Sequence, residues 1–133
     1  MTPQGLTTQP SEFDPEETME RLVSAITRRG AAVLARVDHA AAARAVGLAL
    51  RPTEVAIFGN PRAGTPLMQA AQTMGIDLPL RALVWRDETG RTWLGYNDPA
   101  WLARRHGAEA GHEPALRAMA DFLAAVAQEA TRN

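Results

Sequence analysis

The chain has 133 residues, a formal net charge of −1 and no cysteine. This length suits one domain with a hydrophobic core, and 46% hydrophobic with 22% charged residues is the balance of a folded protein. The lack of cysteine excludes disulfides, a thiolate nucleophile and Cys-ligated zinc. Neither a secretory signal nor an apolar stretch of ~18 residues is present, so we expect a cytoplasmic protein without a membrane partner.

The basic residues form no patch. All 14 of them are arginine, and acidic and basic residues are spread evenly along the chain. Proteins that bind nucleic acids usually carry a basic cluster or a high overall positive charge. We therefore expect no nucleic-acid partner.

The first third of the chain predicts a short N-terminal segment followed by a helix. Residues 1–10 are either flexible or contain a strand at Gly5–Gln9. Asp14 then caps a helix that begins at Pro15 and stops at Gly30. Apolar residues recur along this helix with the 3.6-residue period of one buried face.

The middle of the chain predicts two strands, each followed by a helix. Ala32–Val37 alternates as a strand does, and Asp38 caps a short helix at His39–Val46. Glu54–Phe58 is the next strand. After a turn-rich loop, Pro66–Met74 has helical spacing.

Leu80–Asp87 and Arg91–Tyr96 predict a β-hairpin. The turn of three residues ends in Gly90, which suits the left-handed position of such a connection. The resulting register pairs Asp87 with Arg91, Trp85 with Trp93, and Val84 with Leu94.

Both faces of this hairpin are apolar, so each needs a cover. Helices pack on one face, and a second subunit is the simplest cover for the other. The C-terminal helix or the loop after Phe58 is the alternative cover within the chain. We expect a homodimer, with Trp85, Trp93, Tyr96 and Trp101 as core or dimer contacts rather than as an aromatic ligand platform.

The chain ends in helices. Pro99–His106 is one, and residues 108–133 contain another that begins at Pro114. With the short helix at His39–Val46 left out and the two terminal helices counted together, the order is β-α-β-β-α-β-β-α within one domain, residues 1–133. This order favours an α+β fold, an antiparallel sheet with helices packed on one face.

Four stretches of the sequence resemble a known family. They are ARVDHAAAARAVGL, LRPTEVAIFGNPRAGTPLMQAA, DLPLRALVWRDETGRTWLGYNDP and LARRHG, between Glu12 and Gly107. Together they are similar to the bacterial family called domain of unknown function 302. The resemblance implies a TBP-like α+β fold that is often paired as a dimer, and it implies no reaction.

The segment Ile57–Met68 contains the first candidate site. Its G-x-x-x-x-G spacing imitates a phosphate-binding loop, but Thr65 and Pro66 stand where that motif needs lysine and then serine or threonine. We therefore expect no hydrolysis of ATP or GTP. A helix capped by Thr65 could still hold a small anion, with Arg62 adding charge; the alternative is a turn without a ligand. The candidate ligand-binding residues are Asn60, Arg62, Gly64 and Thr65.

Asp38 and His39 form the second candidate site. A carboxylate beside an imidazole is the pair that a general base needs, although Asp38 is equally explained as a helix cap. The three histidines have no metal-binding spacing, so we expect no metal and no cofactor.

Three functions remain open. The leading hypothesis is a homodimeric domain that binds a small ligand or anion, with Asp38 and His39 converging on the Asn60–Thr65 loop. The second is a small enzyme with an Asp38–His39 general base. The third is a protein-interaction or assembly module whose tryptophan face binds another chain.

Overall fold

The structure, a computed structural model, describes residues 2–133. Its centre is a five-stranded antiparallel sheet in the order β1-β5-β4-β3-β2. The strands are β1 (Leu6–Pro10), β2 (Ala32–Asp38), β3 (Thr53–Gly59), β4 (Leu80–Arg86) and β5 (Thr92–Asn97). The α+β class and the order of elements are as predicted, and the N-terminal segment contributes an edge strand.

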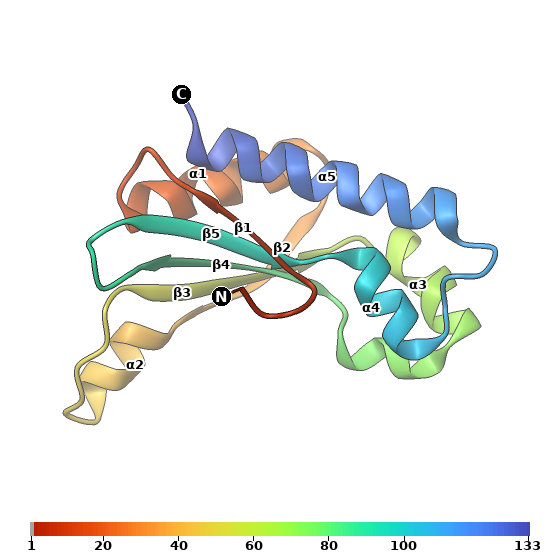
Figure 1. The fold of residues 1–133 in the computed structure, drawn as a ribbon, viewed down its shortest axis with the longest axis horizontal. Coiled ribbons are helices and arrows are strands. Elements are labelled where there is room, and N and C mark those ends of the chain that lie inside the picture. The colour runs from red at the N-terminus through yellow and green to blue at the C-terminus, as the bar shows by residue number, and fades with distance from the viewer. Residues whose placement is uncertain (1) are drawn as a thin grey trace.

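Two long helices, α1 (Pro15–Arg28) and α5 (Glu113–Thr131), lie side by side on one face of the sheet (Figure 1). Apolar side chains from both helices meet the inward side chains of the three middle strands. Burial of this surface is the main favourable term in folding. The core side chains with 0–1% exposure include Met19, Leu22, Ile26, Phe58, Val84, Leu94, Leu123 and Val126.

Shorter helices occupy the two ends of the sheet. Helix α2 (His39–Ala45) projects away from α1 and α5 at one end (Figure 1). At the other end α3 (Pro61–Ala70), the 3₁₀ helix η1 (Gln72–Ile76) and α4 (Pro99–His106) gather under α5. They enclose a second, smaller core that contains Leu67, Met74, Leu102, Ala103, Leu116 and Met119.

Helix starts follow the predicted caps. The Oδ1 of Asp14 accepts a hydrogen bond from the amide of Glu17 at 2.8 Å, and the Oδ1 of Asp38 accepts one from Ala41 at 2.9 Å. Such bonds satisfy amides that have no partner inside the helix. Asp98 caps α4 in the same way, by accepting from the amide of Ala100.

The hairpin register is confirmed. Trp85 pairs with Trp93, Val84 pairs with Leu94, and the amide of Asp87 donates to the carbonyl of Arg91 at 2.8 Å. Val84 and Leu94 face the helices, so the two tryptophans lie on the opposite side of the sheet. We call that side the open face; its apolar residues include Val37, Val55, Ile57, Leu83, Trp85 and Trp93.

The helix predicted to begin at Pro66 begins earlier. In the structure Asn60 is the N-cap, Pro61 is the first helical residue, and Pro66 lies inside α3. Proline at the first position fits a helix because its missing amide would have had no partner there. The cap at Asn60 and the proline after it therefore set the start of α3, although Pro66 then lacks a backbone amide to donate inside the helix. The prediction that Thr65 caps the helix is wrong.

Candidate functional site

The Asn60–Thr65 segment forms the first turn of α3, not a loop before it. The side chain of Asn60 accepts a hydrogen bond from the amide of Arg62 at 2.9 Å, and the carbonyl of Asn60 accepts from Ala63 and Gly64. These bonds use the first free amides of the helix. A ligand at this point would therefore meet side chains more than unpaired backbone donors.

Two cavities flank this turn. The first, of about 380 Å³, is lined mainly by apolar groups and includes Gly64, Thr65, Met68 and Leu78. The second, of about 320 Å³, contains Arg62 together with Met119, Phe122 and other apolar residues. Asn60 lines both cavities. Three of the four predicted ligand-binding residues therefore share the first cavity, and Arg62 lies on the neighbouring one.

The charges at the second cavity are not equally available. Arg29 binds Glu129, with 2.6 Å between its Nη2 and the Oε2 of Glu129. Hydrogen bonds from Arg29 and then Arg28 lower the pKa of the Glu129 carboxyl, although burial acts in the opposite direction. Arg62 is exposed and has no ion-pair partner among residues 2–133. It is the cation available to an incoming ligand.

Asp38 and His39 lie at the opposite end of the sheet. Strands β2 and β3 run antiparallel, so Ala32 pairs with Gly59 whereas Asp38 pairs with Glu54. The prediction that Asp38 and His39 converge on the Asn60–Thr65 segment is wrong, because the ends of two neighbouring strands meet at one edge of the sheet only when the strands are parallel. His39 is exposed, and no hydrogen bond joins its ring to Asp38 in the described chain.

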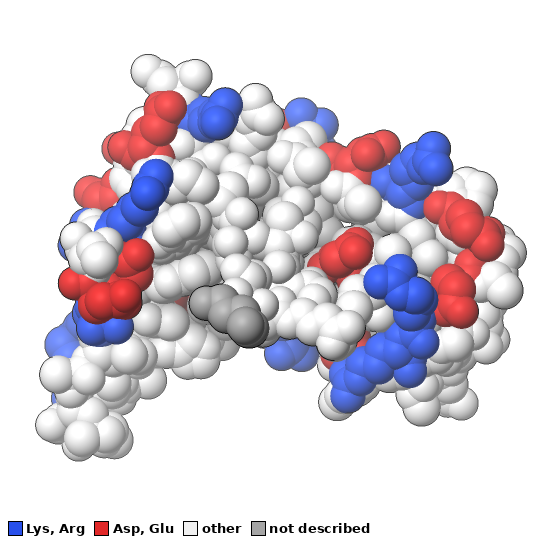
Figure 2. All heavy atoms as spheres, viewed as in Figure 1, with Lys and Arg blue, Asp and Glu red and all other residues white. Residues whose placement is uncertain are grey.

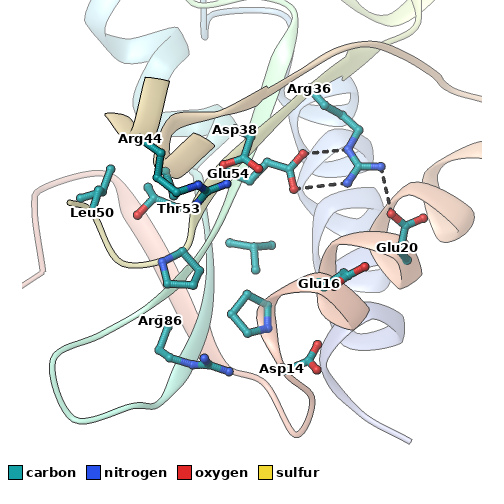
Figure 3. Close-up of a pocket in the computed structure, with 14 residues that line it drawn as sticks. Asp14, Glu16, Glu20, Arg36, Asp38, Arg44, Leu50, Thr53, Glu54 and Arg86 are labelled. Carbon is teal, nitrogen blue, oxygen red and sulfur yellow. Dashed lines mark hydrogen bonds and ion pairs between the residues drawn. The ribbon is translucent and has the colours of Figure 1, made fainter. Parts of the chain in front are cut away.

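A charged cavity adjoins Asp38 instead. It has a volume of about 470 Å³ and lies between the first turns of α1, the base of α2 and the strands. Arg36 forms its wall, held by two hydrogen bonds to Glu54 and one of 3.1 Å to Glu20 (Figure 3). The bond to Glu54 raises the pKa of Arg36, with a smaller contribution from Glu20 and against the effect of burial. Sequence reasoning missed this cavity because its residues come from four separate segments.

The cluster around His106 has a structural explanation. The Nε2 of His106 lies 2.6 Å from the Oδ2 of Asp77, and its Nδ1 lies 2.8 Å from the hydroxyl of Thr73. These bonds, with one from Arg105 to Asp77, tie the end of α4 to η1. Among residues 2–133 no three His, Asp or Glu side chains are arranged to hold a metal ion.

On the face shown in Figure 2, charged side chains gather towards the two ends, with a largely uncharged surface between them. No helix within residues 2–133 is both long enough and apolar enough to cross a bilayer.

Comparison with known proteins gives a family and a fold. The family model for a domain of unknown function, DUF302, matches residues 7–126. The chain also resembles the solved structure of an uncharacterized conserved DUF302 protein from Bacillus stearothermophilus, with a TM-score of 0.85 and 21% identity. That likeness covers 96% of this chain and 99% of the other, and it shows the fold.

The curated relatives are longer proteins. The chain is 50% identical over 115 residues to the protein named fluoride-specific ion channel FluC 1 of Brucella suis biovar 1. The match covers 86% of this chain but 45% of the relative. The corresponding protein of Brucella melitensis biotype 1, named FluC 2, matches equally well over 43% of its length. The chain therefore spans less than half the length of these relatives.

Proposed function

Since the chain belongs to the DUF302 family, whose description carries no activity, we propose from its own geometry that it is a homodimeric domain that binds a small ligand. The observation that carries this proposal is the pair of cavities around the first turn of α3. Each has the size of a typical small-molecule site, which is about 300–1,000 Å³. Their apolar walls would bury a hydrocarbon body, and Arg62 would hold an anionic group.

The lining decides which anions fit. A small, strongly hydrated ion such as fluoride loses its water shell on entering an apolar cavity, and hydrogen bonds must replace that shell. Of the side chains that line the first cavity only Asn60 and Thr65 carry hydrogen-bond donors, which are too few to replace that shell. The proposed ligand is therefore an organic anion, such as a carboxylate with an apolar body.

A thermal-shift series tests this site. Straight-chain carboxylates of increasing length should raise the melting temperature more than the alcohols of equal length. A ligand at about 100 times its Kd adds about 2.7 kcal/mol to the free energy of unfolding. Arg62→Ala should remove the difference in melting temperature between acid and alcohol. The control Arg104→Ala, which replaces an exposed arginine on α4, should preserve that difference.

Two further measurements sharpen the result. Thr65→Val, which removes a hydroxyl at nearly constant shape, should weaken binding if the ligand reaches the first cavity. Sodium fluoride and sodium chloride at equal concentration should give the same melting temperature. Equal shifts from acids and alcohols in the wild type would contradict the proposed role of Arg62.

The homodimer is supported by two apolar surfaces of the chain. One is the open face. The other is the segment 39–50, which we call the arm; at its tip Val46, Leu48 and Leu50 are 72%, 65% and 47% exposed. Helix α5 packs beside α1, so it does not cover the open face. A pair of chains related by a twofold axis would bury both surfaces at once.

A second candidate function comes from the Brucella relatives. We infer that this domain works together with a membrane anion channel, because its close relatives form part of longer chains that are named fluoride-specific ion channels. Fluoride efflux from liposomes tests this. Removal of the matched 115 residues from the full-length Brucella suis protein should abolish or change the rate at which fluoride leaves the liposomes. Identical fluoride efflux rates with the full-length and the shortened protein would contradict the inference.

The enzyme hypothesis has less support in the geometry. An exposed His39 without a bond to Asp38 lacks the orienting partner of a general base. The assembly hypothesis shares its surface with the homodimer, so the oligomeric state of the pure chain separates the two.

A further inference from the structure

The two cavities beside the first turn of α3 share part of their lining. The residues that line both of them are Gly59, Asn60, Ala63, Leu80 and Met119. Gly59 has no side chain and Ala63 has only a methyl group, while Met119 carries a flexible thioether that adapts to its neighbours. The boundary between the cavities is therefore made largely of small or adaptable groups, and one ligand can occupy both.

The charge at this pair of cavities has one sign. Arg29 and Arg62 line the second cavity, and no Asp or Glu within residues 2–133 lines either one. Arg29 is held by Glu129, so Arg62 is left for the ligand. The other side chains of the two linings are uncharged, and most of them are apolar. A molecule that fills both cavities therefore has one anionic end and a long hydrocarbon part.

A bulge in β2 places an exposed leucine at the rim of the first cavity. Val33 pairs with Phe58, and Ala35 pairs with Ile57. Leu34 is the extra residue between them; it is 62% exposed and lines the first cavity. Bulges redirect side chains, and they are frequent beside functional sites. A hydrocarbon chain in the first cavity would cover Leu34, and the burial of apolar surface favours binding.

Gly64 leaves space in the same cavity. It lies inside α3 and its φ is not left-handed, so the backbone does not require glycine, and alanine would favour the helix. A Cβ at this position would lie 3.5 Å from the Cδ1 of Leu78 and 3.9 Å from the Cε of Met68, and both of these residues belong to the lining. The lack of a side chain at Gly64 therefore keeps this part of the first cavity open.

We propose that the two cavities form one binding site for a straight-chain fatty acid, whose carboxylate lies on Arg62 and whose chain passes Ala63 into the first cavity beneath Leu34. This inference rests on the function proposed above and names the class of its ligand. A short carboxylate fills only the second cavity. A longer chain crosses to the first cavity, where Gly64 leaves room for its end.

Isothermal titration with straight-chain carboxylates from butanoate to dodecanoate tests the proposal. Each added methylene that becomes buried should lower the Kd about fourfold. Arg62→Ala should weaken the binding of every acid about tenfold, because it removes the charged partner of the carboxylate. The length of the chain therefore reports on the cavities, and Arg62 reports on the anionic end.

Variants in the first cavity locate the end of the chain. Leu34→Ser should weaken the binding of dodecanoate about tenfold and leave that of butanoate unchanged. Ile76→Ser, which replaces a 67% exposed residue outside both linings, is the matched control and should change neither Kd. Gly64→Leu should act as Leu34→Ser does, because its side chain fills the space for the ligand. If circular dichroism shows that Gly64→Leu is unfolded, Gly64→Ala replaces it; this variant should raise the melting temperature and still weaken the binding of dodecanoate.

The outcomes separate this inference from the function on which it rests. If butanoate binds through Arg62 but dodecanoate is insensitive to both Leu34→Ser and the folded Gly64 variant, the single fatty-acid site is overturned and the proposed function stands. If no carboxylate of any length binds, both are overturned.

Discussion

The indole nitrogen of Trp93 donates a hydrogen bond of 2.8 Å to the Oδ2 of Asp87. The Oδ1 of the same carboxylate accepts bonds from the amide and hydroxyl of Thr89 and from the amide of Arg91. Asp87 therefore organises the hairpin turn and also holds a tryptophan of the open face. The turn and the proposed dimer surface are linked through this one side chain.

Asp87→Asn should make the protein less stable at neutral pH and less sensitive to acid. Hydrogen bonds from Thr89 and then Trp93 hold the pKa of the Asp87 carboxyl far below its usual value. A carboxyl with a lowered folded-state pKa stabilises the fold above its unfolded pKa of about 3.9, and this contribution is lost as the pH falls below that value. Urea unfolding at pH 7 and pH 3, followed by tryptophan fluorescence, should therefore show a smaller difference between variant and wild type at pH 3. Glu88→Gln, an exposed neighbour, is the control.

Trp93→Ala should weaken the homodimer. A buried tryptophan at an interface often contributes about 2 kcal/mol or more, so the dimer Kd should rise at least about tenfold. Light scattering over a range of concentrations measures this, with Leu48→Asp in the arm as a second disrupting variant. Ile76→Ala, a 67% exposed apolar residue at the other end of the molecule, is the matched control. A monomeric wild type at every concentration would contradict the dimer.

Gly5→Ala should destabilise the protein more than Gly30→Ala. Both glycines have a left-handed φ, of 81° and 85°. A Cβ at Gly5 would lie 2.7 Å from the Cε3 of Trp101, whereas one at Gly30 would meet nothing within 4 Å. The difference between the two variants isolates the clash, and we expect roughly 1–3 kcal/mol in the free energy of unfolding from chemical denaturation. Equal losses would show that Trp101 moves aside freely.

Leu123→Ala should cost about 2–5 kcal/mol, because it removes buried atoms and leaves a cavity between α5 and the sheet. Leu123 is 1% exposed and belongs to the main core. Ile76→Ala, on the surface, should change the free energy of unfolding by no more than about 0.5 kcal/mol. Denaturant titration of both variants measures the two losses in the free energy of unfolding. Similar losses would contradict the assignment of Leu123 to the core.

Local signals in the sequence were enough for most elements. Asp14 with Pro15, Asp38, and Asp98 with Pro99 each mark a helix start through bonds to amides a few residues away, and such bonds depend on neighbours in the chain. The pairing of Trp85 with Trp93 followed from the length of the turn, which sets the register of a hairpin. At Asn60 and Thr65 two local signals competed, and in the structure α3 begins after the cap at Asn60.

The candidate sites could not be determined in this way. Whether Asp38 lies near Asn60 depends on whether β2 and β3 are direct neighbours in the antiparallel sheet, and the local pattern of a strand does not show which strands lie beside it. Arg36, Glu54 and Glu20 meet because three segments fold together, and Arg86 reaches the same cavity from a fourth. The sequence by itself determined the helices, the hairpin and the side chains on each face, because these depend on neighbours along the chain. Only the tertiary structure decided which charged side chains share a cavity, because that depends on residues far apart in the sequence.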